Sequence, residues 1–352
     1  MFITGLGTAT PPHRYTQAEC WEAFQAAPQF ALLDRRARTT LQRVLLHDNG
    51  IRTRSLALES LAEVFAADPD TLHRRFALHA PVLAHEAATR ALQQAGLQPQ
   101  DIDAVLISTC TGYLCPGLTS YVGESLGLRP DMLALDLVGQ GCGAALPNLR
   151  AAAALLGADN CKKVLSICVE VCSAAFYLDN DPGVLISACL FGDGAGAAVL
   201  AAEPDAMGRS VEWRAAASLH NPAERDALRF EHKDGMLRNI LSPQVPRLAA
   251  GHASVVLHDV LNRQGMSRDD IDTWIWHAGG RKVIEALQEN LELSAADVVW
   301  SSKVLGEFGN VSSPSVFFTL QAALAGNAPG GWWWMSSFGA GFSCHGALLK
   351  VA

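Results

Sequence analysis

The sequence lacks long uncharged apolar runs. No stretch reaches the roughly 18 apolar residues that a membrane-spanning helix requires. The first residues, Met1–Gly5, contain no basic leader ahead of an apolar segment, which a secretion signal would have. We therefore expect a cytoplasmic protein that neither crosses nor binds a membrane.

Paired cysteines and the fingerprints of metal or nucleotide binding are also absent. The nine cysteines are scattered singly, without a CxxC pair, which is typical of a reducing compartment rather than of a disulfide framework. Gly192–Gly196 is rich in glycine but lacks the long helix and the ribose-binding acid that follow in a dinucleotide site. The sequence therefore predicts no metal site and no tightly bound cofactor.

Charge is scarce, and its balance is acidic. Only 18% of the residues are charged, and 27 Lys and Arg against 35 Asp and Glu give a net charge of -8. Nucleic acid is not an expected partner, because phosphate binding needs a basic field. Residues 34–54 are the exception, since six arginines stand there against only Asp34 and Asp48. This local positive charge favours an anionic ligand.

Apolar residues are abundant, and they follow a repeated pattern. At 352 residues and 49% hydrophobic content, the chain suits two domains of ordinary size. Residues 95–107 resemble residues 264–276, an offset of 264 − 95 = 169, and each copy has the pattern of a helix, a capped turn and a buried strand. The repeat predicts a layered α/β protein with two similar halves, residues 1–205 and 206–352, related by a pseudo-twofold axis.

The repeat brings three distant polar residues to equivalent places. Cys142 lies between two glycines at a predicted strand-to-helix turn, where the helix N-terminus would favour the thiolate. Adding the offset gives 142 + 169 = 311, one residue after Asn310, which precedes a second predicted helix. His277 follows the repeated strand at its carboxyl end, the edge where sites form in parallel sheets. We expect the three side chains to meet.

A cysteine, a histidine and an asparagine in one pocket can join two thioesters through a carbon–carbon bond. Cys142 would accept an acyl group as a thiolate. His277 and Asn310 would donate hydrogen bonds to the oxyanion of the second thioester. If that thioester is malonyl, loss of carbon dioxide leaves an enolate whose charge falls on the same oxygen.

Four motifs carry a resemblance to a known family. Gln140–Gly143, Trp276–Gly280, Gly309–Ser313 and Phe338–Phe342 resemble, in order and spacing, the motifs of the chalcone-synthase-like type III polyketide synthases. The resemblance covers nearly the whole chain. It implies the thiolase fold, a layered αβαβα arrangement, and an acyltransferase that acts as a homodimer. It also implies malonyl-CoA as extender and an acyl starter carried by coenzyme A or by an acyl carrier protein, followed by cyclisation or release.

The resemblance also implies roles for individual residues. Cys142 would be the nucleophile, and His277 with Asn310 the pair that supports decarboxylation. Phe191 matches the aromatic gate between the CoA tunnel and the cavity, and Arg238 or Asn239 stands where plant enzymes have a second gate phenylalanine. The other cavity positions are Cys110, Thr111, Cys172, Ala175, Ser312, Phe338, Gly339 and Gly341, with Cys115 reaching the neighbouring subunit. The positions implied in CoA binding are Arg43, Gly279, Gly280 and Lys282.

Two other functions use the same residue types. A ketoacyl-synthase-III-like enzyme would perform one condensation with the same three residues, and Phe338–Phe342 also resembles the end of that family. A papain-like cysteine hydrolase has Cys, His and Asn in the same chain order. Its nucleophile is usually near the mature N-terminus of a secreted protein, whereas Cys142 lies mid-chain in a duplicated protein.

Overall fold

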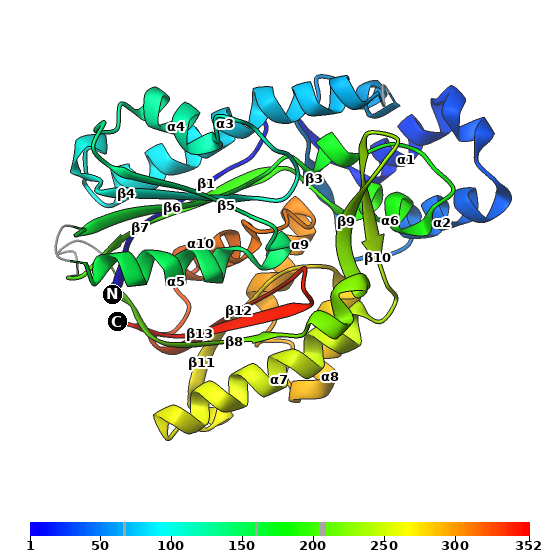
Figure 1. Cartoon of the computed structure of the whole chain (residues 1–352). Helices are drawn as coiled ribbons and strands as arrows, with labels where there is room; N and C mark the ends of the chain where they lie inside the picture. The colour runs from blue at the N-terminus through cyan, green and yellow to red at the C-terminus, as the bar shows by residue number, and fades with distance from the viewer. Residues whose placement is uncertain (66–67, 159–160, 205–208) are drawn as a thin grey trace.

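The computed structural model describes residues 1–65, 68–158, 161–204 and 209–352. Helices and sheets alternate in layers, with two outer helical layers, two sheets and a central helical layer between the sheets (Figure 1). This is the predicted layered α/β arrangement. The predicted boundary between residues 205 and 206 falls outside the described residues, so the division into halves stays a prediction.

The two sheets are joined at one point. The upper sheet in Figure 1 has the order β1-β7-β6-β4-β5 and the lower one the order β11-β12-β13-β8. Phe2 and Ile3 of β1 pair with Glu212 and Val211 of β8, which links all nine strands into one continuous sheet. The upper strands are β1 (Phe2–Ala9), β4 (Ala104–Thr109), β5 (Leu133–Val138), β6 (Lys163–Glu170) and β7 (Gly194–Ala201). The lower strands are β8 (Val211–His220), β11 (Ile271–Trp276), β12 (Gly331–Gly339) and β13 (Ser343–Val351).

Helices cover both faces of each sheet. The outer layers are formed by α3 (Pro69–Gln94) and α4 (Leu118–Leu126) above, and by α7 (Val245–Gln264) and α8 (Arg281–Leu291) below. The central layer holds α5 (Ala145–Leu156) and α10 (Ser315–Ala325), preceded in the chain by α9 (Val299–Phe308). Leu146 and Leu149 of α5 belong with Phe317 of α10 to one buried apolar cluster, so the central layer is the core between the sheets.

The repeated sequence folds in the same way twice. In each copy a long helix is followed by a short capped turn and then by a strand, β4 or β11, that pairs in parallel with its neighbour. The side chain of Asp101 accepts a hydrogen bond from the backbone of Gln98 at 2.9 Å, and Asp270 accepts the equivalent bond from Ser267 at 2.7 Å. The matching caps explain why the polar residues of the repeat recur with its apolar ones.

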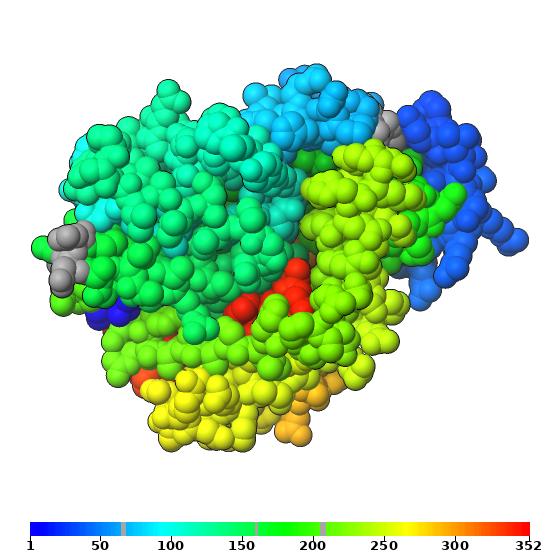
Figure 2. Space-filling model, in the orientation of Figure 1, coloured from blue at the N-terminus to red at the C-terminus, as the bar shows by residue number. Residues whose placement is uncertain are grey.

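A smaller lobe and a hairpin lie beside the layers. The lobe consists of β2 (Arg14–Thr16), α1 (Gln17–Ala26), α2 (Arg35–Leu46), β3 (Thr53–Ser55) and α6 (Pro182–Leu190), and the hairpin of β9 (Leu228–Lys233) and β10 (Met236–Leu241). Figure 2 shows the red C-terminal segment at the base of a hollow between green and yellow-green segments. Among the described residues, no helix combines the length and apolar character needed to cross a bilayer.

Candidate active site

Cys142 lies in a tight turn between a strand and a central helix. β5 ends at Val138, the 3₁₀ turn Gly141–Gly143 follows, and α5 begins at Ala145. Gly141 has φ +56°, a left-handed conformation that side chains disfavour. A Cβ on Gly143 would lie 3.0 Å from the backbone nitrogen of Gly339. The two glycines therefore let the cysteine turn lie directly against the turn between β12 and β13.

His277 and Asn310 come from the segments that follow β11 and α9. His277 follows β11, and its backbone nitrogen donates to the carbonyl of Ser336 at 2.9 Å. Asn310 lies between α9 and α10, where its backbone bridges to Phe191 and its nitrogen donates to Leu190 O at 2.9 Å. Both side chains are buried, at 4% exposure each.

A chain of contacts joins the three residues. Ser312 Oγ donates to Cys142 Sγ at 3.2 Å, and the Ser312 backbone nitrogen donates to Asn310 Oδ1 at 2.9 Å. Asn310 Nδ2 donates to the carbonyl of Gly279 at 3.1 Å, and the Gly279 nitrogen in turn donates to the carbonyl of His277 at 2.9 Å. The contacts thus join the side chains of Cys142 and Asn310 through Ser312, and they join Asn310 to the backbone of His277 through Gly279.

Burial determines the charge state of this pocket. It raises the pKa of the Cys142 thiol to about 12, although the hydrogen bond from Ser312 acts in the opposite direction. It lowers the pKa of His277 to about 4. At neutral pH the resting pair is therefore a neutral thiol and a neutral imidazole. The direction is opposite to the expected thiolate, because desolvation outweighs the hydrogen bonds that lower the pKa of the thiol.

Glu170 is a central polar residue that the sequence analysis missed. It is fully buried at the end of β6, and its carboxyl group accepts hydrogen bonds from Thr111 Oγ1 at 2.9 Å, Ser313 Oγ at 2.6 Å and the Cys110 backbone at 3.0 Å. Burial raises its pKa. Ser312 Oγ lies 3.5 Å from Oε1 of Glu170. The carboxyl group therefore fixes the hydroxyls that surround the cysteine. A lone acid ending an apolar strand was the signal that could have revealed it.

A cavity opens beside Ser312. Its lining includes Thr111, Cys172, Ala175, Phe191 and Ser312. Cys110 is not among the lining residues, but its Sγ lies 3.8 Å from Ser312 Oγ.

Two neighbouring hairpin residues, Arg238 and Asn239, were the alternatives for the second gate position, and only one of them lines this cavity. Arg238 does not line it; its guanidinium pairs with Asp181 and with Glu231, the latter at 3.2 Å. Its neighbour Asn239 lines the cavity and donates to Ser187 Oγ at 2.6 Å. Because successive residues of a strand point to opposite faces, only one of the pair can face inward.

The remaining predicted residues lie in three places. Phe338 is buried with its ring in edge contact with His277, at 6.5 Å between centroids, and Gly339 and Gly341 continue the same turn. Cys115 is exposed. Arg43 and Lys282 are exposed on α2 and α8, and Gly279 and Gly280 immediately precede α8. An ion pair between Arg281 and Asp48 joins the start of α8 to the segment that follows α2.

Comparisons with known proteins place the chain in a family. Residues 1–204 match the family model of chalcone and stilbene synthases, N-terminal domain, and residues 261–351 match that of the 3-oxoacyl-[acyl-carrier-protein] synthase III C-terminal domain. The chain is 31% identical to 3,5-dihydroxyphenylacetyl-CoA synthase of Streptomyces toyocaensis, over 99% of this chain and 89% of the relative. It is 33% identical to 1,3,6,8-tetrahydroxynaphthalene synthase of Streptomyces peucetius subsp. caesius, over 99% and 92%.

Solved structures resemble the whole chain. PKS-I from the brown alga Ectocarpus siliculosus superposes with a TM-score of 0.89 at 28% identity, covering 99% of this chain and 98% of the other. Tetrahydroxynaphthalene synthase from Streptomyces coelicolor A3(2) gives a TM-score of 0.86 at 23% identity, with 99% of each chain covered. The second likeness bears on the fold alone.

The fold is thus the thiolase fold, and it defines an acyltransferase of the condensing class. Within that class, the chain belongs to the chalcone and stilbene synthase family, the type III polyketide synthases. It performs iterative decarboxylative condensations of CoA thioesters, and the family uses these substrates without a bound cofactor.

Proposed function

We propose that Cys142 carries the growing chain, while His277 and Asn310 support both decarboxylation and condensation. The observation behind this assignment is the contact chain from Cys142 through Ser312 and Asn310 to the loop after His277. In the first step Cys142 Sγ attacks the thioester carbonyl of the starter. The new S–C bond forms, the bond to the CoA sulfur breaks, and neutral His277 moves the thiol proton to the departing CoA.

Decarboxylation then uses hydrogen-bond donors of the site that have no partner within the protein. Asn310 Nδ2 carries two hydrogens, of which one is donated to Gly279 and the other is available to a thioester oxygen. Loss of carbon dioxide from malonyl-CoA places negative charge on that oxygen, where Asn310 and His277 stabilise it. The enolate carbon attacks the acyl-Cys142 carbonyl, a carbon–carbon bond forms, and the cysteine sulfur leaves and regains a proton.

We assign malonyl-CoA as extender and an acyl-CoA as starter. Arg43, Lys282, Gly279 and Gly280 would hold the CoA, because the Arg281–Asp48 ion pair draws the start of α8 to the end of α2. Phe191, whose backbone bridges to Asn310, would be the gate beside the cavity. The similar enzymes named for tetrahydroxynaphthalene and dihydroxyphenylacetyl-CoA make hydroxylated aromatic rings, so we infer cyclisation of the extended chain here.

We also propose that two copies of the chain associate through the exposed edge of the upper sheet. Leu133 and Val138 of the edge strand β5 are 45% and 59% exposed, and nearby Tyr113 is 69% exposed. An exposed apolar strand edge is a surface that proteins usually cover. Cys115, exposed in the segment that precedes α4, would reach the neighbouring subunit. All nine cysteines are free, in keeping with a cytoplasmic location.

The test is product formation. Purified protein is incubated with ¹⁴C-malonyl-CoA and acyl-CoA starters of several kinds, and the products are separated and weighed by mass spectrometry. We expect products that contain two or more malonyl-derived units and that have lost water or CoA on ring closure. Malonyl-CoA left intact with every starter would contradict the proposal.

A second candidate for the donor of the starter is an acyl carrier protein in place of coenzyme A. The match of residues 261–351 to the 3-oxoacyl-[acyl-carrier-protein] synthase III family favours it, since that segment contains His277 and Asn310. Repeating the incubation with the starter on a carrier protein separates the two candidates, because product should then form with that donor and not with the acyl-CoA.

A further inference from the structure

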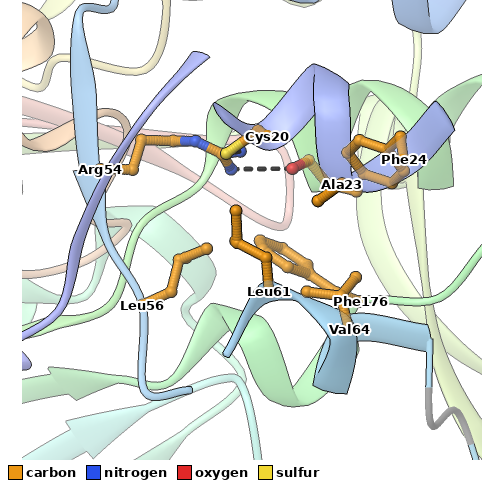
Figure 3. A pocket seen from close by; sticks show the side chains of 9 residues that line it. Cys20, Ala23, Phe24, Arg54, Leu56, Leu61, Val64 and Phe176 are labelled. Atoms are coloured by element: carbon orange, nitrogen blue, oxygen red, sulfur yellow. Dashed lines mark hydrogen bonds between the residues drawn. The ribbon is translucent and has the colours of Figure 1, made fainter. Parts of the chain in front are cut away.

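A groove lies on the outer surface of the lobe, between α1 and α2, which Figure 2 shows in blue at the edge of the molecule. Its lining includes Trp21, Phe30, Arg35, Arg38, Thr39 and Gln42. None of these residues lines the cavity beside Ser312. The inner face of α1 is already occupied, because Cys20 and Phe24 line an enclosed pocket in the interior of the lobe (Figure 3). The groove therefore uses a different face of α1.

Helix α2 has three faces of different character. The inner face belongs to the apolar cluster of the lobe and consists of Ala37, Leu41 and Leu45. The face on the groove has the spacing of three and four residues that aligns side chains along a helix, and it consists of Arg35, Arg38, Thr39 and Gln42. Arg36 and Arg43 are seven residues apart and share the third face. The groove is thus separate from the face that carries Arg43, which we propose for CoA.

The groove has positive charge that the chain itself does not neutralise. Helix α2 contains four arginines and no acidic residue, in a chain whose net charge is -8. Arg35 and Arg38 form no ion pair with a carboxylate among the described residues. Asp34, the acid next to them in the sequence, caps α2 by accepting from the Ala37 nitrogen at 2.7 Å. An acidic partner is therefore attracted to this surface and repelled by most of the remaining molecule.

The groove also offers apolar surface. Trp21 and Phe30 are partly exposed and meet edge to face, with 5.7 Å between their ring centroids. The guanidinium of Arg38 lies over the Phe30 ring, 6.0 Å from its centroid. Leu32, in the same turn as Phe30, is 81% exposed. Aromatic and arginine side chains are the residues that contribute most to protein–protein binding, so this surface suits another protein.

We infer that the groove between α1 and α2 binds an acidic helix of an acyl carrier protein that delivers the starter. The inference rests on the second candidate donor given under the proposed function. Carboxylates of the carrier helix pair with Arg35 and Arg38, and its apolar side chains cover Trp21 and Phe30.

The position of the groove suits delivery to the active site. Arg43 follows Arg38 by five residues on the same helix, about 8 Å along its axis. A carrier in the groove therefore lies beside the proposed CoA site, and its phosphopantetheine arm enters where CoA would. The acyl group then passes from the pantetheine sulfur to Cys142 Sγ, and the proton of the cysteine thiol moves to the departing sulfur.

The first experiment measures docking without chemistry. A fluorescently labelled acyl carrier protein that lacks its phosphopantetheine arm is titrated with the wild type and with variants, and anisotropy gives the Kd. Reversing both groove charges, with Arg35→Glu and Arg38→Glu together, should raise the Kd at least about tenfold, because like charges then face the carrier. Trp21→Ala should raise it about tenfold, as loss of an aromatic anchor does. Added salt should weaken binding of the wild type more than binding of the double variant.

Arg36→Glu is the matched control. It reverses the same charge on the same helix, but on a face outside the groove, and it should leave the Kd within about twofold of the wild type. A second measurement follows transfer of the acyl group from a loaded carrier to Cys142 by intact-protein mass spectrometry. This transfer should slow in the groove variants. Malonyl-CoA decarboxylation should stay within about twofold in the double variant, since Arg43 is unchanged.

Each outcome bears on the inference or on the proposed function. Failure of the carrier to bind the wild type, equal Kd values in the wild type and the groove variants, or an equal loss in Arg36→Glu would overturn the inference. A changed solution mass of the groove variants would assign the groove to a second copy of this chain, and decarboxylation lost together with carrier binding would assign it to coenzyme A. Docking that depends on the groove, with no acyl group reaching Cys142 from either donor, would count against the proposed function alone.

Discussion

Replacing Asn310 tests the proposed oxyanion site, because the two polar atoms of its side chain have different hydrogen-bond partners. Its Oδ1 accepts from the Ser312 backbone at 2.9 Å, while its Nδ2 donates to Gly279 at 3.1 Å and has one hydrogen left. Asn310→Ala removes both groups. Asn310→Asp keeps the acceptor for Ser312, loses the donor, and adds negative charge where the enolate forms.

The expected magnitudes differ for rate and stability. Loss of one oxyanion donor lowers kcat for malonyl-CoA decarboxylation by about 10²–10³, equivalent to ~2.7–4 kcal/mol, in both variants. In Asn310→Ala the buried Ser312 N–H also loses its partner, which costs about 1–3 kcal/mol of unfolding free energy. Asn310→Asp retains that hydrogen bond, but it buries a carboxylate oxygen against the Gly279 carbonyl, so it too should lose stability. Measuring rate and stability together in both variants therefore separates a damaged site from a damaged fold.

The assay follows acetyl-CoA formation from malonyl-CoA by liquid chromatography, without a starter, at saturating substrate. Urea unfolding followed by tryptophan fluorescence gives the stability of each variant. Decarboxylation within about threefold of the wild type in a folded Asn310→Ala protein would refute the reasoning, because an oxyanion donor contributes far more than that.

Three other predictions concern the same pocket. Cys142→Ala should abolish starter transfer yet leave part of the malonyl-CoA decarboxylation, and equal loss of both, measured in parallel, would contradict the division of roles. The pKa of His277 is lowered from 6.5 to about 4, so the unfolded chain binds a proton that the folded chain does not, and unfolding free energy should fall by up to about 3 kcal/mol from pH 6.5 to 4. His277→Gln should remove that part of the pH dependence in urea titrations, and an unchanged slope would count against it. Glu170→Ala leaves several buried hydrogen-bond donors without their acceptor and should lower the free energy of unfolding by about 3 kcal/mol, measured by thermal unfolding. Glu170→Gln keeps an acceptor and should lower it less, and equal losses in the two variants would contradict this.

Much of the fold could be predicted because the sequence repeats itself. Residues 95–107 and 264–276 have the same spacing of apolar residues and the same capping acids. Because helix, turn and strand follow in the same order in both copies, the repeat shows which helices and strands correspond. That correspondence was enough to place Cys142, Asn310 and His277 at one edge. The pairing of Phe2 and Ile3 with Val211 and Glu212, which joins the sheets, depends on contacts between halves that no local pattern encodes.

The pocket's electrostatics could not be predicted in the same way. The sequence indicates a helix that starts beside Cys142, but it does not indicate the burial that raises the pKa of the thiol. It left Arg238 and Asn239 as alternatives, since the register of the hairpin decides which faces the cavity. Glu170 was missed because its partners Thr111 and Ser313 come from segments far apart in the chain.

The most direct measurement is the site of acylation. Protein mixed briefly with an acyl-CoA starter is digested with pepsin at low pH, and the peptides are sequenced by mass spectrometry. We expect one acyl group on the peptide that contains Cys142 and none in the Cys142→Ala variant. An acyl group on Cys110 or Cys172 instead, or an adduct that persists in Cys142→Ala, would contradict it.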